Sequence, residues 1–470
     1  MTECNPQSLD FQPLQRRAVV GRFDGGRLTS DGGALLLREV ELRTGILKQF
    51  AGCFTDYRDP DLIEHSLYTL LAQRVFGLAL GYEDLNDHDE LRADPLLAVA
   101  VNHPDPLGTQ RRKAEDWGKP LAGKSTLNRL ELTPARADPG SRYKKVVYQR
   151  GALEKLFVAL FLQAHPQPPE EILLDLDATD DPVHGQQQGR FFHGYYKEYC
   201  YLPLYIFCGE HLLCARLRPA NIDGAAGALK QVQRIVAQIR EKWPQVRIVL
   251  RGDSGFCREH LMAFCEGNGL FYIFGLARNS RLEAELAPEL AQAQAQFAAT
   301  GQAARVFKDF VYQTLTSWGG ARRVVGKAEY LEKGANPRFV VTNIPAEEQA
   351  ARRLYEETYC ARGEMENRIK EQQLFLFADR TSAATMRANQ LRLWFASVAY
   401  VLLCALRRLG LAQTELEHAT CQTIRLKLLK IGARIRVTAR KIWLSLAEGY
   451  PLKRLFMGVC GKLRALPLRC

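Results

Sequence analysis

Two short stretches decide the fold: ILLDLDAT at residues 172–179 and RIVLRGDSGF at residues 247–256. The first alternates aspartate with leucine, which predicts a buried strand with Asp175 and Asp177 on one face and Asp177 at its carboxyl end. The second begins as a strand and ends in a glycine-containing turn that carries Asp253. Two carboxylates at the ends of neighbouring strands are able to share divalent cations, whereas either one alone is more often a turn cap.

The segments around these strands complete the predicted order of an α/β fold. We expect a hairpin over residues 199–219, a long helix over 224–243, a short helix over 259–266 and a strand over 270–277. Strand, hairpin, helix, strand, helix, strand is the order of a ribonuclease H-like core. Residues 279–345 interrupt it with an Ala- and Gln-rich helix and β-like segments, which predicts a β-rich insertion.

The chain therefore divides into five predicted regions. They are a helical N-terminal region (1–165), the first part of the core (166–278), the β-rich insertion (279–345), the second part of the core (346–400) and a basic helical C-terminal region (401–470). Residues 421–470 carry twelve Lys and Arg against one Glu, which is nearly all of the net charge of +12. A basic excess gathered at one end of a chain is typical of proteins that bind a polyanion.

Composition narrows the class of protein. The apolar run at 391–406 is short and carries Arg392, so we expect a buried helix there and no membrane span. The first seventeen residues lack the apolar core of a secretory signal, which predicts a cytoplasmic protein. The twelve cysteines form no C-x-x-C pair, and we expect them to be thiols.

A third acidic position follows in TYCARGEMENRIKEQQ at residues 358–373. Helical spacing puts one set of side chains on a single polar face: Tyr359, Arg362, Glu366, Lys370 and Gln373. Taken alone, this face is also what a solvated helix with an Arg362–Glu366 ion pair would present.

Three motifs follow one another along the chain: Asp177-Ala-Thr179, then Arg251-Gly-Asp253-Ser-Gly-Phe256, then Tyr359-x₂-Arg362-x₃-Glu366. In this order the chain resembles DDE transposases of the IS-four-like group of bacterial insertion sequences. The runs LTSDGGALLLRE at 28–39 and HGQQQGRFFHGYY at 184–196 are similar to the thirteen-eighty family of that group. One departure is Gln373, which stands where the family pattern has lysine, and Lys370 is the nearest substitute.

The resemblance implies an enzyme that cuts and joins DNA. Asp177, Asp253 and Glu366 would be the catalytic residues and would hold two Mg²⁺ ions, with Mn²⁺ as a substitute. Water would attack at the transposon end, and the released 3′-hydroxyl would then attack target DNA. Tyr359, Arg362 and Lys370 would contact phosphates beside the scissile bond.

The same resemblance implies the partners. They are double-stranded DNA, as terminal inverted repeats and as target, and a second copy of the chain in a synaptic homodimer, in the cytoplasm of a bacterium and associated with its nucleoid. The N-terminal helical region would bind DNA. Two alternatives stay open at this point: a nuclease of the same fold without strand transfer, and a DNA-binding protein without catalysis.

Further candidate DNA contacts lie outside the three motifs. Trp318, at a predicted turn of the insertion, is a candidate for stacking on an unpaired base, with packing inside a small β-core as the alternative. Lys124 and Arg129 are candidates for DNA contact or helix capping. Arg434 and Arg436 belong to a basic segment, residues 424–446, whose spacing predicts a helix that touches phosphates.

Two other patterns have ordinary explanations. Residues 118–125 fit the P-loop pattern, but a charged segment precedes them where a P-loop needs a buried strand, so no nucleotide cofactor is expected. The acidic run at 83–90 is predicted to form helix caps and solvated turns. His184 and His193 lie close to Asp177 in the sequence without the spacing of metal ligands, and no role is assigned to them.

Overall fold

The computed structural model describes residues 8–469, which form two compact units. One unit comprises residues 8–148, 375–377 and 398–469, and the other comprises residues 149–374 and 378–397. Cys4, Cys470 and the first seven residues, on which part of the cysteine and localisation predictions rest, lie outside the described residues. The functional division at residues 165, 278, 345 and 400 stays a prediction.

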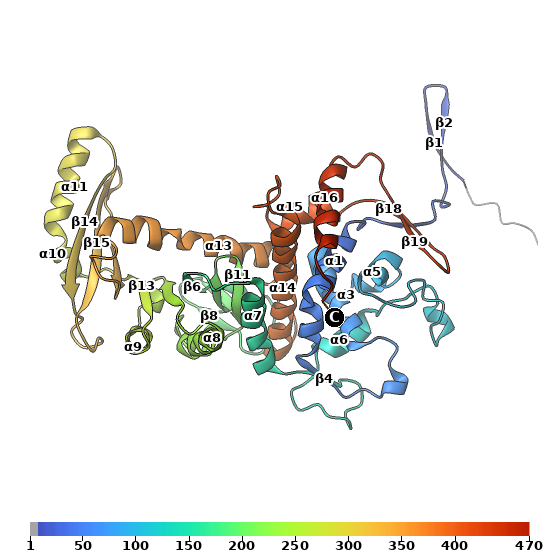
Figure 1. Cartoon of the computed structure of the whole chain (residues 1–470), viewed down its shortest axis with the longest axis horizontal. Helices are drawn as coiled ribbons and strands as arrows, with labels where there is room; N and C mark the ends of the chain where they lie inside the picture. The colour runs from blue at the N-terminus through green and yellow to red at the C-terminus, as the bar shows by residue number, and fades with distance from the viewer. Residues whose placement is uncertain (1–7, 470) are drawn as a thin grey trace, which may run out of the picture. The chain divides into compact units, whose positions relative to one another are not determined.

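The second unit is built on one large mixed sheet (Figure 1). Its first five strands lie in the order β11-β10-β6-β12-β13. Strand β10 is antiparallel to β6 and to β11, whereas β12 is parallel to both β6 and β13. This is the ribonuclease H-like order that the sequence predicts. The bounds are β6 (Glu171–Ala178), β10 (Leu204–Cys208), β11 (His211–Arg216), β12 (Arg247–Gly252) and β13 (Phe271–Leu276).

The β-rich segment extends this same sheet. Strand β17 pairs antiparallel with β13, and β15 then pairs with β17, β14 and β16. The strands of residues 279–345 are therefore a continuation of the core sheet, because the free edge of β13 offers its backbone groups to β17. The elements are α10 (Ser280–Glu285), α11 (Ala287–Thr300), β14 (Ala304–Tyr312), β15 (Arg322–Leu331), β16 (Gly334–Ala335) and β17 (Arg338–Thr342).

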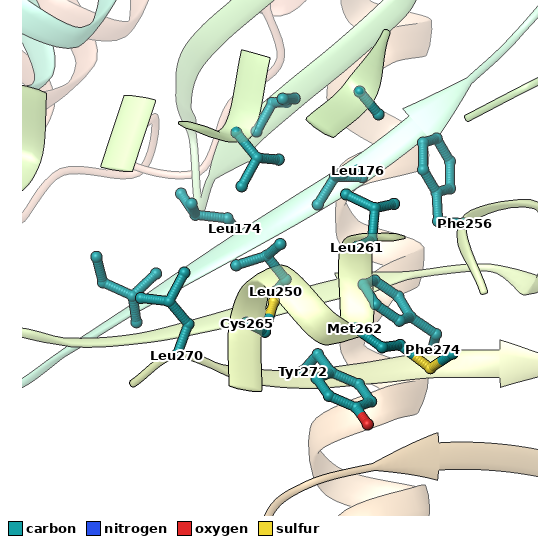
Figure 2. Close-up of a cluster of buried hydrophobic side chains, with 14 of the residues drawn as sticks. Leu174, Leu176, Leu250, Phe256, Leu261, Met262, Cys265, Leu270, Tyr272 and Phe274 are labelled. Carbon is teal, nitrogen blue, oxygen red and sulfur yellow. The ribbon is translucent and has the colours of Figure 1, made fainter. Parts of the chain in front are cut away.

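One face of the sheet packs against α7 (Arg150–Ala164), α8 (Ala228–Lys242) and α9 (Glu259–Gly267). Alternation along the strands sends Leu174, Leu176 and Leu250 into this core, where they meet Leu261 and Met262 of α9 (Figure 2). The predicted helix at 224–243 begins at Ala228, because Gly227 has φ +75° and lies outside the right-handed helical region.

The opposite face of the sheet is covered by a continuous helical segment from Ala351 to Leu376. Its pieces are α12 (Ala351–Arg353), η4 (Leu354–Tyr359), η5 (Cys360–Arg362), α13 (Gly363–Lys370) and η6 (Glu371–Phe375), of which η4 and η6 are π-helical. Leu354 and Tyr355 pack against Val249 and Ile273 of the sheet. π-helical turns inside α-helices occur often at functional sites.

A small antiparallel sheet accompanies this unit, in the order β7-β9-β8. It comprises β7 (Asp181–Pro182), β8 (Phe191–His193) and β9 (Glu198–Tyr201). The predicted hairpin at 199–219 is thus the β10–β11 pair, whereas Tyr199 to Tyr201 belong to this separate sheet.

The first unit is mainly helical, and two adjacent glycines near its N-terminal end form hydrogen bonds to its C-terminal part. Gly32 and Gly33 donate backbone hydrogen bonds to the carbonyls of Ile431 (2.8 Å) and Leu429 (3.0 Å). Its elements are β1 (Leu9–Leu14), β2 (Arg17–Gly21), β3 (Arg27–Thr29), α1 (Ala34–Thr44), α2 (Ile46–Ala51), β4 (Phe54–Asp56), η1 (Pro60–Leu62), α3 (Leu67–Leu80), α4 (His88–Leu91), α5 (Pro95–Ala100), η2 (Ala114–Asp116), α6 (Lys124–Glu131), β5 (Val146–Tyr148), η7 (Arg407–Leu411), α15 (Cys421–Ile424), η8 (Arg425–Leu429), β18 (Ala433–Val437), β19 (Ile442–Leu446) and α16 (Lys453–Ala465).

The helix predicted over 424–446 is wrong for its second half. Residues 433–437 and 442–446 are strands β18 and β19, which form a three-stranded sheet with β3. Strand β18 alternates arginine with Ala433, Ile435 and Val437, which is the period of two of a half-buried strand. Burial of Ala433 and Ile435 on one face decides the structure in favour of the strand.

The long apolar helix is α14 (Met386–Leu406), the element with the predicted buried run. With the turn that follows it, it has the length and composition to cross a membrane, but 83% of its most apolar window is buried inside the protein. All ten cysteines that the structure describes are free thiols, as predicted.

The addition of a methyl group at Gly33 tests the close approach of this residue to the backbone of Leu428 and Leu429. A Cβ there would lie 1.9 Å from the Leu428 carbonyl oxygen, so we expect Gly33→Ala to lower the free energy of unfolding by about 1–3 kcal/mol or more. Gly458→Ala in α16 is the control, because no atom lies within 4 Å of its Cβ position. Equal urea unfolding midpoints for the two variants would contradict the close approach.

Candidate functional site

Strand register brings the two aspartates to the same edge of the sheet. In the parallel pairing of β6 with β12, Leu176 lies opposite Gly252. Asp177 and Asp253 are the next residues along their strands, so both carboxylates emerge where the strands end. Asp253 also begins the turn that follows, since its Oδ1 accepts a hydrogen bond from the Gly255 N–H (2.8 Å).

The helical segment at 351–376 adds the third carboxylate. Arg362, Glu366, Lys370 and Gln373 line one cavity of about 580 Å³ together with Asp177 and Asp253. The sequence predicts one shared face for Tyr359 and these four residues; all four line the cavity, whereas Tyr359 does not.

The guanidinium of Arg362 lies between two of the carboxylates. Its Nη2 donates to Glu366 Oε1 at 2.8 Å, and its Nη1 is 4.0 Å from Asp177 Oδ2. Burial alone would lower the pKa of Arg362, but the neighbouring carboxylates and Tyr359 raise it above its usual value. This arginine is therefore charged, and its positive charge offsets part of the negative charge of the three carboxylates.

The surroundings of Asp177 disfavour the charged form of its carboxyl group. Burial raises the pKa of its carboxyl to about 7, and repulsion from Asp253 and Glu366 adds to the rise, while Arg362 and the Ala178 N–H oppose it. A buried carboxylate beside two others is stabilised by a bound cation, because the cation compensates charges that the protein leaves unbalanced.

The donor set fits a divalent metal ion, since it consists of carboxylate oxygens around one cavity. Within residues 8–469, no three His, Cys, Asp or Glu side chains are already close enough to hold an ion. Arg362 stands between Asp177 and Glu366 in this arrangement, so it has to shift before both carboxylates reach the same ion.

Beneath the cavity, a buried ion pair joins the three elements that carry the acids. Arg251 of β12 donates from Nε (2.5 Å) and Nη2 (2.8 Å) to both oxygens of Asp175 on β6. Its Nη1 donates to the backbone carbonyl of Thr358 in the helical segment. Arg251 and Asp175 are 3% and 4% exposed, so the pair is shielded from water. The ion pair therefore fixes the positions of both strands relative to the helical segment that carries Glu366.

Tyr359 lies beside Asp253, one turn before Arg362. A methyl group at Gly275 would come within 2.6 Å of its hydroxyl and 2.9 Å of the Ser254 nitrogen, so only glycine fits between β13 and this tyrosine. Gln373, which stands at the family's lysine position, donates from Nε2 to the Asp180 carbonyl (2.9 Å). Its amide thus braces the chain just after β6, while the exposed Lys370 supplies a cation to the cavity.

The other predicted DNA contacts are placed elsewhere. Trp318 is 7% exposed and meets the Tyr312 ring edge to face at 5.8 Å, so its ring is packed in the core as the sequence alternative has it. Arg434 and Arg436 share the exposed face of β18, with Arg436 5.7 Å from the ring centre of Trp443. Two residues apart, these arginines share one face of the strand, whereas the predicted helix would turn them to different sides.

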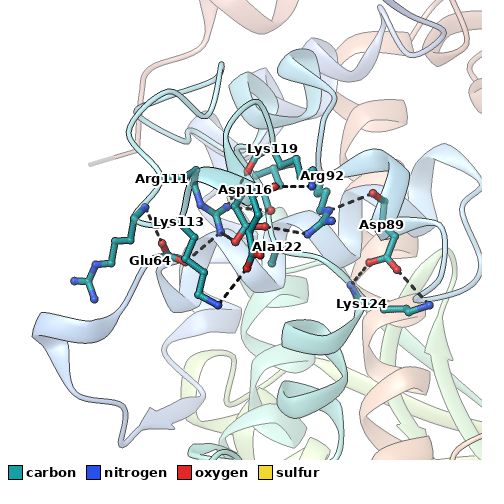
Figure 3. Close-up of polar contacts among 12 residues, drawn as sticks. Glu64, Asp89, Arg92, Arg111, Lys113, Asp116, Lys119, Ala122 and Lys124 are labelled. Atoms are coloured by element: carbon teal, nitrogen blue, oxygen red, sulfur yellow. Dashed lines mark hydrogen bonds and ion pairs between the residues drawn. The ribbon is translucent and has the colours of Figure 1, made fainter.

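Lys124 and Arg129 belong to α6 in the first unit. The ammonium group of Lys124 is 3.2 Å from Asp89, and the Lys124 backbone N–H donates to the same carboxylate (3.0 Å) (Figure 3). The guanidinium of Arg129 lies 5.1 Å from the Tyr143 ring centre, and both line a cavity of about 410 Å³. Three further basic residues line it: Arg58, Arg142 and Lys145.

The P-loop-like run and the acidic run of the sequence form ordinary turns and ion pairs. The 3₁₀ turn η2 precedes the P-loop-like run at 118–125, where a P-loop requires a buried strand. In the acidic run at 83–90, Asp87 accepts the Asp84 N–H (3.0 Å) as a turn residue, and Asp89 pairs with Lys124. His184 is exposed, whereas His193 lines the cavity that contains Asp177, Asp253 and Glu366.

Sequence reasoning missed two groups at this site. The first is the ion pair of Asp175 with Arg251, whose signal is that each residue stands two positions before one of the acids. The second is the pair Tyr195 and Tyr196, which line the cavity from the turn between β8 and β9. Its signal is the aromatic run FFHGYYKEYCY at 191–201.

The strand order is ribonuclease H-like, and Asp177 and Asp253 stand at the ends of its neighbouring strands, an arrangement that is able to hold divalent cations. Residues 11–468 match the family described as Transposase DDE domain group 1, and the chain belongs to that family. It is thus a DDE transposase by family. No curated protein matches the sequence. A solved structure that matches is the piggyBac transposase synaptic complex with hairpin DNA, at 11% identity and a TM-score of 0.43, over 84% of this chain and 80% of that one.

Removal of either partner of the buried ion pair is expected to destabilise the second unit. Arg251→Met or Asp175→Leu leaves one buried charge without its partner, which lowers the free energy of unfolding by about 3–5 kcal/mol. The double variant buries no charge and is expected to lose much less, as measured by urea unfolding of the four proteins in a double-mutant cycle.

The exposed pair of Arg353 and Glu357 provides the control. Its side chains are 68% and 67% exposed, so alanine at either position is expected to change stability by less than about 1 kcal/mol. Simple additivity of the Arg251 and Asp175 losses would show that the pair does not act as a unit.

Proposed function

We propose that this transposase cleaves DNA at the terminal inverted repeats of its own insertion sequence and joins the ends to target DNA. Asp177, Asp253 and Glu366 would be its catalytic residues. The observation that carries the proposal is that these three carboxylates, distant in sequence, line one cavity with Arg362 and Lys370. A cavity with three acids and two bases suits a phosphodiester and the cations that accompany it.

The three carboxylates would hold Mg²⁺, with two ions as the arrangement that phosphoryl transfer uses most often and Mn²⁺ as a substitute. When bound, such ions activate the attacking oxygen and stabilise the leaving oxygen. The fit rests on three carboxylates that line one cavity and on the raised pKa of Asp177, to which burial and the charges of Asp253 and Glu366 contribute.

The remaining cavity residues would bind and orient the DNA. Arg362, which here occupies the space between Asp177 and Glu366, would turn its guanidinium to a phosphate beside the scissile bond. Lys370 would take the place of the family's lysine. The Tyr359 hydroxyl, beside Asp253 and above Gly275, would donate to the same stretch of phosphate backbone.

The first unit carries basic surfaces that would add to DNA binding. Arg434 and Arg436 on the β19-β18-β3 sheet and the basic cavity at Arg129 are the surfaces that favour this. By family analogy the protein would pair two ends as a homodimer, in the bacterial cytoplasm with the nucleoid.

Conservative replacement of the acids tests the chemistry. Asp253→Asn and Glu366→Gln are expected to bind labelled element ends as the unaltered protein does, but to give no cleaved or joined product with Mg²⁺. Chelation of Mg²⁺ should abolish both products in the unaltered protein. The assay uses purified protein, element ends and a target plasmid.

Glu364→Gln is the matched control, since Glu364 is exposed on the same helix and does not line the cavity. It should keep full activity. Joining by Asp253→Asn at the unaltered rate would reject the proposed site, and cleavage without joining by the unaltered protein would make it a nuclease.

Neutralisation of the basic sheet tests its role. Arg434→Ala and Arg436→Ala are each expected to weaken binding to all duplex sequences alike and to reduce the slope of log affinity against log salt by about 1. Arg353→Ala in the second unit, where Arg353 pairs with Glu357, removes the same charge without this effect. An unchanged salt slope in both β18 variants would exclude the sheet from the DNA interface.

A further inference from the structure

Arg362 places a positive charge between two of the proposed metal ligands, Asp177 and Glu366. Its Nη2 donates to Glu366 Oε1 at 2.8 Å, and its Nη1 lies 4.0 Å from Asp177 Oδ2. The side chain of Arg362 is 20% exposed and that of Asp177 16%, so dissolved salt screens their attraction only in part. Two donors of one guanidinium thus face two acids that come from distant parts of the chain.

A divalent cation needs the same oxygens that Arg362 contacts. Magnesium and calcium ions are held by carboxylate oxygens, and an ion shared by Asp177 and Glu366 requires the space between them. A guanidinium in that space excludes the ion by its volume, and like charges at such short range repel each other. The metal ion and the guanidinium are therefore alternative occupants, and each weakens the binding of the other.

Arg362 stands at a junction between three kinds of helix. It ends the 3₁₀ turn η5, which follows the π-helical η4, and it directly precedes Gly363, the first residue of α13. A stretch of 3₁₀-helix inside a longer helix often marks a hinge, because its hydrogen-bond geometry is poorer than that of an α-helix. This junction therefore gives Arg362 more freedom to move than a position inside α13 would.

A phosphate group offers Arg362 a different partner. Arg362 and Lys370 line the same cavity as the acids, so a DNA phosphate that enters the cavity meets both cations. A guanidinium binds phosphate through two parallel hydrogen bonds, whereas Arg362 contacts only one oxygen each of Glu366 and Asp177 here. A phosphate therefore competes for Arg362, and the departure of the guanidinium leaves the space between Asp177 and Glu366 open to a metal ion.

We propose that Arg362 blocks divalent cations from the cavity until a DNA phosphate draws its guanidinium away from Asp177 and Glu366. DNA and metal ions then bind cooperatively, and metal-dependent chemistry is confined to a cavity that already holds DNA. The proposal rests on the proposed function, because that function brings both DNA and metal ions to this cavity. Its direct consequence is that the DNA-free protein binds metal ions more tightly once the Arg362 side chain is removed.

Binding of Mn²⁺ to the DNA-free protein tests the block. The titration is made at a mildly alkaline pH, where Asp177, whose pKa is about 7, is ionised, and free Mn²⁺ is measured by electron paramagnetic resonance. Arg362→Gln and Arg362→Ala are each expected to bind Mn²⁺ about 5–150-fold more tightly than the unaltered protein. Glu366→Gln added to Arg362→Gln should remove this gain, which would place the gained site in the cavity.

Lys370→Gln is the matched control, because Lys370 is a second cation that lines the cavity. It removes the same charge without freeing the space between Asp177 and Glu366, and Lys370 is exposed, so the gain in Mn²⁺ affinity is expected to be much smaller. Equal gains in Lys370→Gln and Arg362→Gln would overturn the proposal, because net charge alone would then explain them. An unchanged or weaker affinity in both Arg362 variants would overturn it as well.

A duplex that carries the element end tests the role of DNA. After subtraction of the Mn²⁺ that DNA binds alone, this duplex is expected to raise the Mn²⁺ affinity of the unaltered protein by a larger factor than that of Arg362→Gln. The metal contacts of the DNA phosphates are common to both proteins, so the difference between the factors belongs to Arg362. Equal factors would overturn the proposal.

The proposed function fails in a different way. If none of these proteins binds Mn²⁺ at the cavity, with DNA or without it, the proposed metal site is rejected together with the block. If Mn²⁺ binds and Arg362→Gln changes nothing, only the block is rejected. Cleavage and joining by Asp253→Asn and Glu366→Gln test the proposed chemistry separately.

Discussion

The buried pair of Arg251 with Asp175 is the interaction on which the site depends. Arg251 lies directly opposite Asp175 in the parallel pairing of β12 with β6, and it also binds the Thr358 carbonyl of the helical segment. Three elements from distant parts of the chain thus share one guanidinium. Because Asp253 and Asp177 each stand two residues further along their strands, the pair also sets the spacing of the two acids. A planar guanidinium with several donors is suited to hold such a junction, whereas lysine is not.

The cavity next to this ion pair is lined by three carboxylates, and the protein does not supply enough positive charge to neutralise them. Arg362, which lies between Asp177 and Glu366, and the exposed Lys370 compensate this charge in part. An acidic cavity of this kind is unfavourable for the isolated protein, as the raised pKa of Asp177 shows, and favourable for a protein that receives cations and phosphates there. Tyr195 and Tyr196 add aromatic side chains to the lining of the same cavity.

Much of the core was predictable because its signals are local. Alternation of Leu174, Asp175, Leu176 and Asp177 specifies a strand with one apolar face, and this holds whatever the strand pairs with. Where the sequence prediction fails, tertiary burial outweighs local spacing. Residues 433–446 carry arginines at intervals that suit either a helix or a strand, and the burial of Ile435 in the β19-β18-β3 sheet selects the strand. Likewise, residues 279–345 have strand patterns, but only pairing with β13 makes them part of the core sheet.

By itself, the sequence determined the element order of the core and the shared face of Arg362, Glu366 and Lys370, because each follows from a period of two or 3.6 residues within one segment. The choice of Asp177, Asp253 and Glu366 as catalytic residues rests instead on the order of three motifs and on the family that they resemble, and it stays a prediction. The tertiary structure alone decided that Arg251 pairs with Asp175, that Arg362 lies between two carboxylates, that Trp318 is packed, and that Tyr195 and Tyr196 border the cavity. These are contacts between residues far apart in the chain, and they depend on strand order and on the register of the helix against the sheet, which no local pattern encodes.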